Sequence, residues 1–309
     1  MLTDIEFDIT PEQAGIRLDN ALFAHCPSSS RAECRRAIEH GRVLVNRHTC
    51  PKGAKLRPGD RIQVLRLEET SDLRPTPNPA LPVRVVYEDE ALVAADKPAG
   101  MPVQPLSGEE TGSLMNGLVA RFPELAEVGD DPLMAGALHR IDSGTSGLVL
   151  AARTNAAFTE MRRQFAAREV AKIYLAVVEG SVSKPGRLEH DLAHLPHRSA
   201  CKMVDARMLS KPGRIFRAVT EFRPLRSVGS ATLLEVAIRT GVTHQIRAQL
   251  ALAGFPIVND TLYGAKPVAS ITGHLLHALS VEFKHPVSGV QCKIATGFPK
   301  RLNLGGVSA

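Results

Sequence analysis

The fold of this chain is decided by the segment HRIDSGTSG, which spans residues 139–147. The apolar residues 135–138 lead into it, and the apolar run 147–152 that follows predicts a buried strand. Between them a single carboxylate, Asp142, lies among Gly, Ser and Thr, residues that form turns and leave space beside the backbone. We therefore expect a loop that holds Asp142 at the edge of a sheet, where it either faces a substrate or caps its own turn.

Working outward from this loop, strands and helices follow one another in groups. Continuous apolar runs predict strands at residues 91–95, 173–178 and 233–238. Apolar residues spaced three to four apart predict one helix capped by Asn155 and another capped by Thr243. Strict alternation of strand and helix is missing, so the pattern favours an α+β domain with a mixed, mainly antiparallel sheet over a doubly wound fold.

A proline-rich segment divides the chain into two predicted domains. Residues 66–81 contain three prolines, a fourth follows at Pro82, and few of these residues are apolar, which is typical of a linker. The boundary leaves a small domain at residues 1–65 and a larger one at residues 82–309, and a length of 309 residues suits two domains.

The small domain is predicted to contain two helices followed by a small sheet. The apolar spacing from Leu18 to Cys26 predicts the first helix, and the second begins at the serine cap of residues 28–30 and ends at Gly41. Strands are expected at residues 43–46 and again after a tight turn at Pro58.

The surplus positive charge of the chain lies in this small domain. Residues 15–64 contain ten Lys or Arg against four acids, which matches the net charge of +6 of the whole chain. This concentration predicts binding to a polyanion, most simply a nucleic acid, although a basic face that only meets solvent would give the same count. With no Trp and 4% aromatic residues, we do not expect a platform of stacked rings for a single strand.

Most of the small domain resembles the S-four RNA-binding domain, named after a small-subunit ribosomal protein. The segments that carry the resemblance, over about residues 15–64, are RLDNAL, SRAECRRAIEHGRVLVN and LRPGDRIQV. The resemblance implies a small α+β domain of the alpha-L type whose basic helix pair lies against structured RNA. It makes Arg31, Arg35 and Arg36 the expected phosphate contacts, which position a protein on RNA but read no sequence.

The larger domain resembles the RluA-type pseudouridine synthases. HRIDSGTSG matches their signature H-R-[LI]-D-x-x-T-S-G. Further family segments follow in the family's order, namely VVYEDEALVAADKPAGMPV, KIYLAVVEG, GVTHQIRAQLALAG, FPIVNDTLYG and LHALSVEFKHPVSG. The resemblance implies that the protein isomerises uridine to pseudouridine within RNA, without a metal or cofactor. In that reaction the N1–C1′ bond breaks, the uracil turns, and C5 is joined to C1′, which requires the target base to be flipped out of its stack.

The resemblance also assigns roles by motif position. It makes Asp142 the catalytic aspartate, Tyr174 the tyrosine near the flipped base and Arg247 the basic partner of Asp142. Arg140 matches the arginine that enters the space the base leaves. His139 is grouped with Arg140 at the substrate, or it braces the loop. Taken without the motifs, Tyr174 would be ordinary sheet core and Arg247 an ordinary surface charge.

Elementary chemistry is consistent with these roles. Asp142 must be ionised, whether it attacks C1′ or removes a sugar proton to form a glycal, and both routes stay open. A nearby guanidinium such as that of Arg247 favours the ionised carboxylate. A tyrosine offers a flat face for uracil and a hydroxyl for proton exchange at C5.

Three positions near the expected cleft depart from the commonest family pattern: Ser143, Val242 and Gln104. These departures do not change the expected reaction, but they leave the identity of the target RNA open. Large-subunit ribosomal RNA is the favoured target, with transfer RNA as the alternative. A second alternative is a non-catalytic RNA-binding or ribosome-assembly factor that retains the same scaffold. A serine hydrolase is not expected, because the G-x-S-x-G elbow is missing.

Other features predict no additional chemistry. Five cysteines without a C-x-x-C pair indicate reduced thiols. The histidines His190, His194 and His197 have metal-like spacing, but no acidic or Cys residue completes a site, so no metal is expected. There is no apolar run long enough for a membrane helix and no secretion signal at the start. We therefore expect a cytosolic protein that does not bind membranes, with a monomer as the default state.

Overall fold

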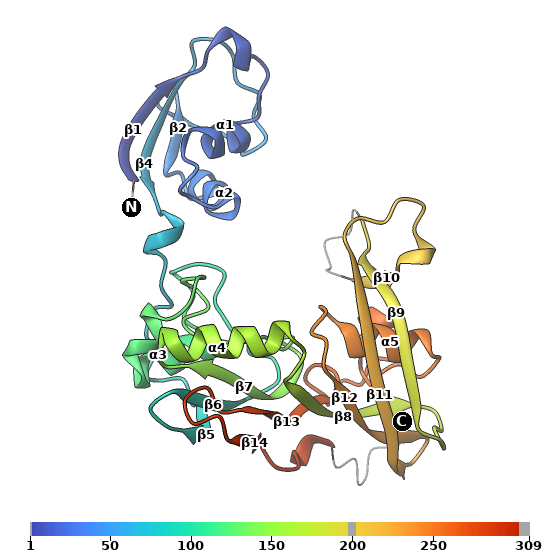
Figure 1. The fold of residues 1–309 in the computed structure, drawn as a ribbon. Helices are drawn as coiled ribbons and strands as arrows, with labels where there is room; N and C mark the ends of the chain where they lie inside the picture. The colour runs from blue at the N-terminus through green and yellow to red at the C-terminus, as the bar shows by residue number, and fades with distance from the viewer. Residues whose placement is uncertain (1, 197–201, 303–309) are drawn as a thin grey trace. The chain divides into compact units, whose positions relative to one another are not determined.

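The computed structural model describes residues 2–196 and 202–302, and these form two compact units (Figure 1). The smaller unit contains the chain up to Thr76 together with Leu106–Glu110 and Asp130–Leu133. The larger unit contains the remaining segments, beginning at Pro77. The units are therefore not two continuous stretches of sequence, which the proline-rich segment alone does not indicate.

The smaller unit consists of two helices on a four-stranded sheet of order β1-β4-β2-β3. Its elements are β1 (Leu2–Asp8), α1 (Leu18–His25), α2 (Arg31–Glu39), β2 (Val43–Val45), β3 (His48–Thr49) and β4 (Arg61–Leu67). As predicted, α2 begins after Ser30, whose hydroxyl accepts a hydrogen bond from the Glu33 amide at 3.0 Å, and the chain turns away at Gly41, where φ is +69°. Strand β1, which pairs antiparallel with β4, was not predicted because none of its residues is fully buried and its apolar residues Leu2, Ile5 and Phe7 do not alternate regularly. Strand β4 also includes residues 66 and 67, the first two of the expected linker.

The larger unit is built on one ten-stranded sheet of order β10-β9-β11-β12-β8-β13-β7-β6-β5, with β14 paired to β13. Its strands are β5 (Arg84–Glu88), β6 (Leu92–Lys97), β7 (Ser146–Ala152), β8 (Ala171–Glu179), β9 (Gly186–His194), β10 (Met203–Asp205), β11 (Ile215–Val228), β12 (Ala231–Ile238), β13 (Leu276–Lys284) and β14 (Gln291–Ala295). Among the described strands, only β13 and β7 pair in parallel. The predicted α+β class with a mixed, mainly antiparallel sheet is confirmed.

Three helices cover this sheet: α3 (Leu114–Arg121), α4 (Asn155–Ala166) and α5 (Gln245–Leu252). Helix α4 packs on β7, and α5 packs on β9 and β11 (Figure 1). Short 3-10 helices occur at η1 (Pro11–Gln13), η2 (Thr70–Asp72), η3 (Pro123–Glu127), η4 (Ala206–Met208), η5 (Thr261–Tyr263) and η6 (Lys300–Leu302). None of the described helices is long and apolar enough to cross a membrane.

Two predicted helix caps were wrong by one residue. Thr154, not Asn155, caps α4, because its extended backbone lets the hydroxyl accept from the Ala157 amide at 3.2 Å. Asn155 instead accepts from the Gly129 amide. Helix α5 follows His244, not Thr243, and His244 has the left-handed backbone, with φ +52°. In both places several polar residues are adjacent, and the sequence does not show which one takes the cap position.

The contact between β7 and β13 anchors the loop that carries Asp142. Every residue of β7 is buried. Gly147 lies opposite Ala278 with φ +113°, and a Cβ atom on Gly147 would lie 2.2 Å from the Ala278 carbonyl oxygen. Only glycine fits this position, so the end of the HRIDSGTSG segment is fixed within an interior strand of the sheet.

Candidate active site

Asp142 lies in the loop before β7, and its side chain is 25% exposed. The loop is closed by a hydrogen bond from the Thr145 amide to the Asp142 carbonyl, 3.0 Å long. The Arg247 Nη1 atom on α5 donates to Asp142 Oδ2 at 2.8 Å. The structure therefore brings together two residues that are 105 positions apart in the sequence.

Arg247 is held from its other side by Asp260, which the sequence did not single out. Arg247 donates through Nε and Nη2 to the two carboxylate oxygens of Asp260, at 2.7 and 2.8 Å, and both side chains are buried. Burial alone would lower the pKa of Arg247, but hydrogen bonds to Asp260 and the charge of Asp142 outweigh it and raise that pKa. The guanidinium stays charged, and its position is fixed independently of Asp142.

A histidine and a tyrosine complete the surroundings of Asp142. His244 Nε2 lies 3.8 Å from Asp142 Oδ1, and His244 Nδ1 lies 3.1 Å from the Tyr263 hydroxyl. The Arg247 guanidinium carbon lies 5.1 Å from the centroid of the Tyr263 ring, a cation–π distance. Burial lowers the pKa of His244, with Asp142 opposing the shift, so His244 is neutral at pH 7. Arg247 therefore supplies the positive charge beside Asp142.

Tyr174 lies on β8, between Val236 of β12 and Ala278 of β13, and is 7% exposed. Burial, and to a smaller extent the charge of Asp142, raises the pKa of the Tyr174 phenol. The structure thus places Tyr174 close enough to Asp142 to sense its charge. Its hydroxyl stays protonated at neutral pH.

The structure separates the two residues that precede Asp142 in the motif. Arg140 is exposed, and its Nη1 atom donates to Gln104 Oε1 at 3.3 Å. His139 Nε2 accepts a hydrogen bond from the Leu150 amide at 3.1 Å, and its ring faces Phe165. Burial, with a smaller effect of a nearby lysine, lowers the pKa of His139 to about 3. These contacts brace the loop against β7 and α4 and do not bring His139 into the group around Asp142.

The three arginines expected to bind phosphate lie on α2 of the smaller unit. Arg35 is 52% exposed, with its Nε 3.5 Å from Asp19, and Arg31 is exposed over the Phe23 ring. Arg36 is only 22% exposed, and its guanidinium bonds to a buried glutamate and to a backbone carbonyl of the same unit. Arg31 and Arg35 are therefore open to a ligand, whereas Arg36 faces the protein, a difference that helical spacing does not show.

A buried lysine connects a second motif to the loop that carries Asp142. Lys97 is fully buried, and its Nζ donates to the carbonyls of Pro98, Met101 and Ser143 at 2.9, 2.6 and 3.2 Å. Burial lowers the pKa of Lys97 to about 8, with the charge of Asp142 opposing the shift. Both Lys97 and Asp260 belong to family segments, DKPAG and NDTLYG, but nothing in those segments marks either residue as a partner of the Asp142 loop.

The histidines with metal-like spacing make other contacts. His190 Nδ1 lies 3.1 Å from the Gln249 amide nitrogen, and the His194 ring packs edge-on against Phe216. His197 lies outside the described residues. In residues 2–196 and 202–302, no group of three or more His, Cys, Asp or Glu side chains is arranged to hold a metal ion.

Comparison with known proteins gives matches over both units. A family model described as RNA pseudouridylate synthase matches residues 91–252, and an S4 domain model matches residues 16–62. "Ribosomal large subunit pseudouridine synthase D" of Neisseria meningitidis serogroup B is 35% identical, over 94% of this chain and 78% of the relative. The protein of the same name from Xanthomonas campestris pv. campestris is 36% identical, over 95% of this chain and 89% of the relative. The solved structure of "Human RNA Pseudouridylate Synthase Domain Containing 1" matches with a TM-score of 0.56 at 22% identity, over 71% of this chain and 84% of that one, which shows a shared fold.

Proposed function

Since the chain belongs to the RNA pseudouridylate synthase family, we propose that it converts specific uridines of ribosomal RNA to pseudouridine, with Asp142 as the catalytic carboxylate. The matches confirm both resemblances noted in the sequence, to the pseudouridine synthases and to the S-four domain. The relatives named for the large ribosomal subunit favour ribosomal RNA over transfer RNA as the target.

One observation carries the assignment of Asp142: it is a partly exposed carboxylate bonded to a buried guanidinium that a second carboxylate holds in place. Arg247 bonds only the Oδ2 atom of Asp142. We take the Oδ1 atom as the one that meets the flipped nucleotide, either at C1′ as a nucleophile or at a sugar proton as a base. A reacting group held this firmly can gain on the order of 7 to 11 kcal/mol from positioning, on which a rearrangement without a cofactor depends heavily.

Tyr174 is proposed to support the flipped uracil. Its raised pKa makes the phenol a poor base at neutral pH, so it acts as a flat apolar surface and a hydrogen-bond donor. The hydrogen that leaves C5 after the new bond forms would then be taken up by another group, and we propose the Asp142 carboxylate for this step.

The smaller unit is proposed to dock the substrate through Arg31 and Arg35, whose guanidinium groups are accessible. We further propose that the protein acts as a monomer in the cytosol. The free thiols of Cys26, Cys34, Cys50 and Cys292 support a reducing compartment. Light scattering during gel filtration should give a mass near 33.3 kDa, and a dimer mass would refute the monomer.

The decisive experiment uses RNA that carries tritium at C5 of uridine, because joining C5 to C1′ releases that hydrogen. The Asp142→Asn variant should bind this RNA with affinity close to that of the unchanged protein and release no tritium. Asp191→Asn, an exposed aspartate on β9, is the matched control and should keep full activity. Measurable conversion by Asp142→Asn would exclude the proposed mechanism.

The target follows from mapping pseudouridine across total RNA in cells with and without this gene. Loss of one or a few sites in large-subunit ribosomal RNA is the expected result. Loss confined to transfer RNA would overturn the proposed substrate. An unchanged map would favour the non-catalytic RNA-binding factor instead.

A further inference from the structure

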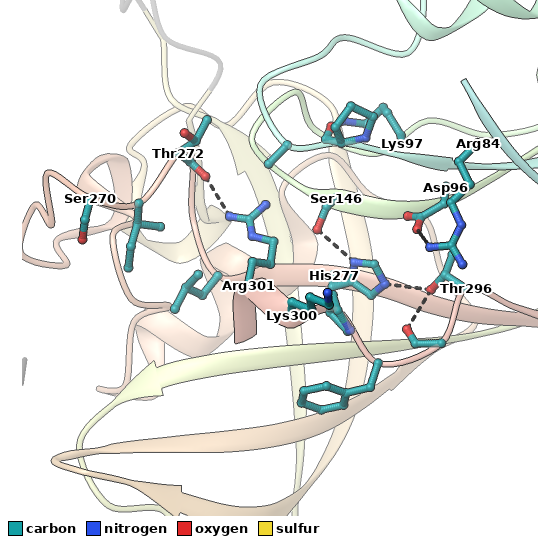
Figure 2. A pocket seen from close by; sticks show the side chains of 17 residues that line it. Arg84, Asp96, Lys97, Ser146, Ser270, Thr272, His277, Thr296, Lys300 and Arg301 are labelled. Atoms are coloured by element: carbon teal, nitrogen blue, oxygen red, sulfur yellow. Dashed lines mark hydrogen bonds and ion pairs between the residues drawn. The ribbon is translucent and has the colours of Figure 1, made fainter. Parts of the chain in front are cut away.

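A pocket of about 840 Å³ lies in the larger unit, and Asp142 is not among its lining residues (Figure 2). Its walls come from the end of β6, from the segment 270–275 and from residues 296–301. Pockets of roughly 300 to 1,000 Å³ commonly hold small ligands, and this one is large enough for a nucleotide. The mechanism proposed above makes no use of it.

The pocket has more positive than negative charge. Four basic residues line it, and the one acidic residue, Asp96, forms an ion pair with Arg84 at 3.1 Å (Figure 2). Lys300 is exposed and has no ion pair with the described residues. Lys97 and Arg301 contact backbone carbonyls instead of carboxylates. The walls therefore favour an anion.

Arg301 has an unused donor. Its Nη2 atom donates to the carbonyl of Thr272 at 2.7 Å (Figure 2) and to that of His274 at 3.0 Å, which holds the guanidinium against the pocket wall. Its Nη1 atom is buried and has no hydrogen-bond partner among residues 2–196 and 202–302. A buried cationic donor without an acceptor is costly, and Arg301 is one of the residues that line the pocket.

The pocket also has an aromatic wall. Phe298 is 53% exposed, unusual for a phenylalanine, and Ile271 and Pro98 add apolar surface. An exposed ring beside fixed cations is the combination with which proteins hold single nucleotides, because every base can stack on an aromatic face. Anion preference and stacking surface thus occur in one cavity.

Hydrogen bonds connect two walls of this pocket to the catalytic loop. Lys97 Nζ donates to the Ser143 carbonyl, one residue from Asp142. On the other wall, the Arg301 guanidinium bonds the His274 carbonyl, and His274 Nε2 lies 2.7 Å from the Thr145 hydroxyl in the same loop. The pocket and the loop that carries Asp142 are therefore joined by direct hydrogen bonds.

We propose that this pocket binds a second nucleotide of the substrate RNA, with its phosphate on Arg301 and Lys300 and its base stacked on Phe298. The proposal rests on the proposed function, since it assigns the ligand to the RNA that reacts at Asp142. The pocket determines which strand conformation reaches Asp142 and contributes to the choice of target.

The test measures binding of labelled substrate RNA to the full-length protein as salt is raised. Phe298→Ala should weaken binding by about 5- to 100-fold without changing the slope of log affinity against log salt, because stacking releases no counterion. Lys300→Ala and Arg301→Ala should lower that slope by about 0.7 to 0.9, the change expected for one phosphate contact. Arg301→Lys keeps the charge and should restore most of the slope.

Two controls separate this result from damage to the fold. Lys184→Ala removes an exposed lysine that does not line the pocket and should leave affinity and slope unchanged. All pocket variants should raise KM and keep kcat within about twofold, since none of these residues is in the group around Asp142. A fall in kcat with unchanged RNA affinity would mean that Arg301 only supports the catalytic loop and would overturn the proposal.

A second arm distinguishes RNA from free nucleotides. Uridine 5′-monophosphate should bind the unchanged protein only weakly by calorimetry, whereas tight binding that Arg301→Ala abolishes would identify a free nucleotide as the ligand and overturn the assignment to RNA. If the Phe298 and Lys300 variants keep the RNA affinity and the salt slope of the unchanged protein and still release tritium, the pocket proposal is wrong. The proposed function is then unaffected. Absence of tritium release from any RNA would instead count against the proposed function.

Discussion

Replacing Asp260 and replacing Asp142 should have opposite consequences, although both carboxylates bond the same guanidinium. Asp260 is 2% exposed and makes two hydrogen bonds to Arg247, at 2.7 and 2.8 Å. Breaking a buried ion pair by removing one partner costs about 3 to 5 kcal/mol, since the remaining charge stays buried. Asn at position 260 keeps one acceptor oxygen, so we expect a loss of about 3 kcal/mol, near the lower end.

Asp142→Asn should cost little stability. Its carboxylate is 25% exposed, it makes one hydrogen bond to Arg247, and Arg247 keeps both bonds to Asp260. The amide oxygen of Asn can still accept from Arg247, so the expected loss is below about 1 kcal/mol. Activity should follow the reverse order. Asp142→Asn loses all turnover, whereas Asp260→Asn loses on the order of 10- to 100-fold as Arg247 moves away from its position.

Urea unfolding followed by tyrosine fluorescence measures the stability. There is no Trp, and the three tyrosines, Tyr87, Tyr174 and Tyr263, all lie in the larger unit, so the signal reports on the unit that contains the site. With a denaturant slope of about 3 kcal/mol per molar, the Asp260→Asn midpoint should fall by about 1 M and the Asp142→Asn midpoint by less than about 0.3 M. Equal shifts for the two variants, or full activity in Asp260→Asn, would refute the division of roles around Arg247.

Three further predictions test other parts of the structure. Arg140→Ala should reduce turnover on a duplexed target more than on an isolated single strand, and equal losses in tritium release would contradict its role in replacing the flipped base. Gly147→Ala should cost about 3 kcal/mol or more in urea unfolding, because its Cβ would lie 2.2 Å from the Ala278 oxygen, while Gly180→Ala, with positive φ but open space, should cost about 1 to 2 kcal/mol. Burial, and to a smaller extent Arg301, lowers the pKa of His277 to about 4, so between about pH 6.5 and 4 the unfolded chain binds the extra proton. Stability should therefore fall by up to about 3 kcal/mol as pH falls through that window, and His277→Gln should remove this part of the loss; an unchanged pH profile of the urea midpoint would contradict the neutral buried histidine.

In the larger unit, the sequence predicted several strands that are buried on both faces and missed half-buried strands such as β9. The strands at residues 91–95, 147–152 and 173–178 are continuous apolar runs in interior strands of the sheet. Strand β9, by contrast, alternates partly buried and exposed residues and was not predicted, because its pattern contains as many charges as apolar side chains. Half-buried strands depend on the neighbours they pair with, which local periodicity does not report.

In the site, too, the sequence identified some residues and missed others. Resemblance placed Asp142, Tyr174 and Arg247 by motif, but Asp260 is needed to explain why Arg247 is fixed, and its contact with Arg247 depends on how α5 meets the segment before η5. Lys97 was similarly hidden, because its three acceptors are backbone carbonyls, which every residue has. A side chain that supports a site by bonding backbone carbonyls can have any residue as its partner. Such a contact therefore cannot be recognised from residue types in the sequence.

The charges around the loop that carries Asp142 bear on how its proposed catalytic carboxylate can work beside RNA. Asp142 and Asp260 bring two negative charges, and Arg247 neutralises one, since His244 is neutral. A phosphodiester approaching Asp142 would be repelled by the remaining charge unless another cation lay nearby. Lys97 is that cation: it is buried without a carboxylate, and it senses the Asp142 charge. Its pKa of about 8 keeps it mostly protonated at pH 7, so the balance holds at neutral pH and weakens as pH rises through 8, where the remaining negative charge would begin to oppose RNA.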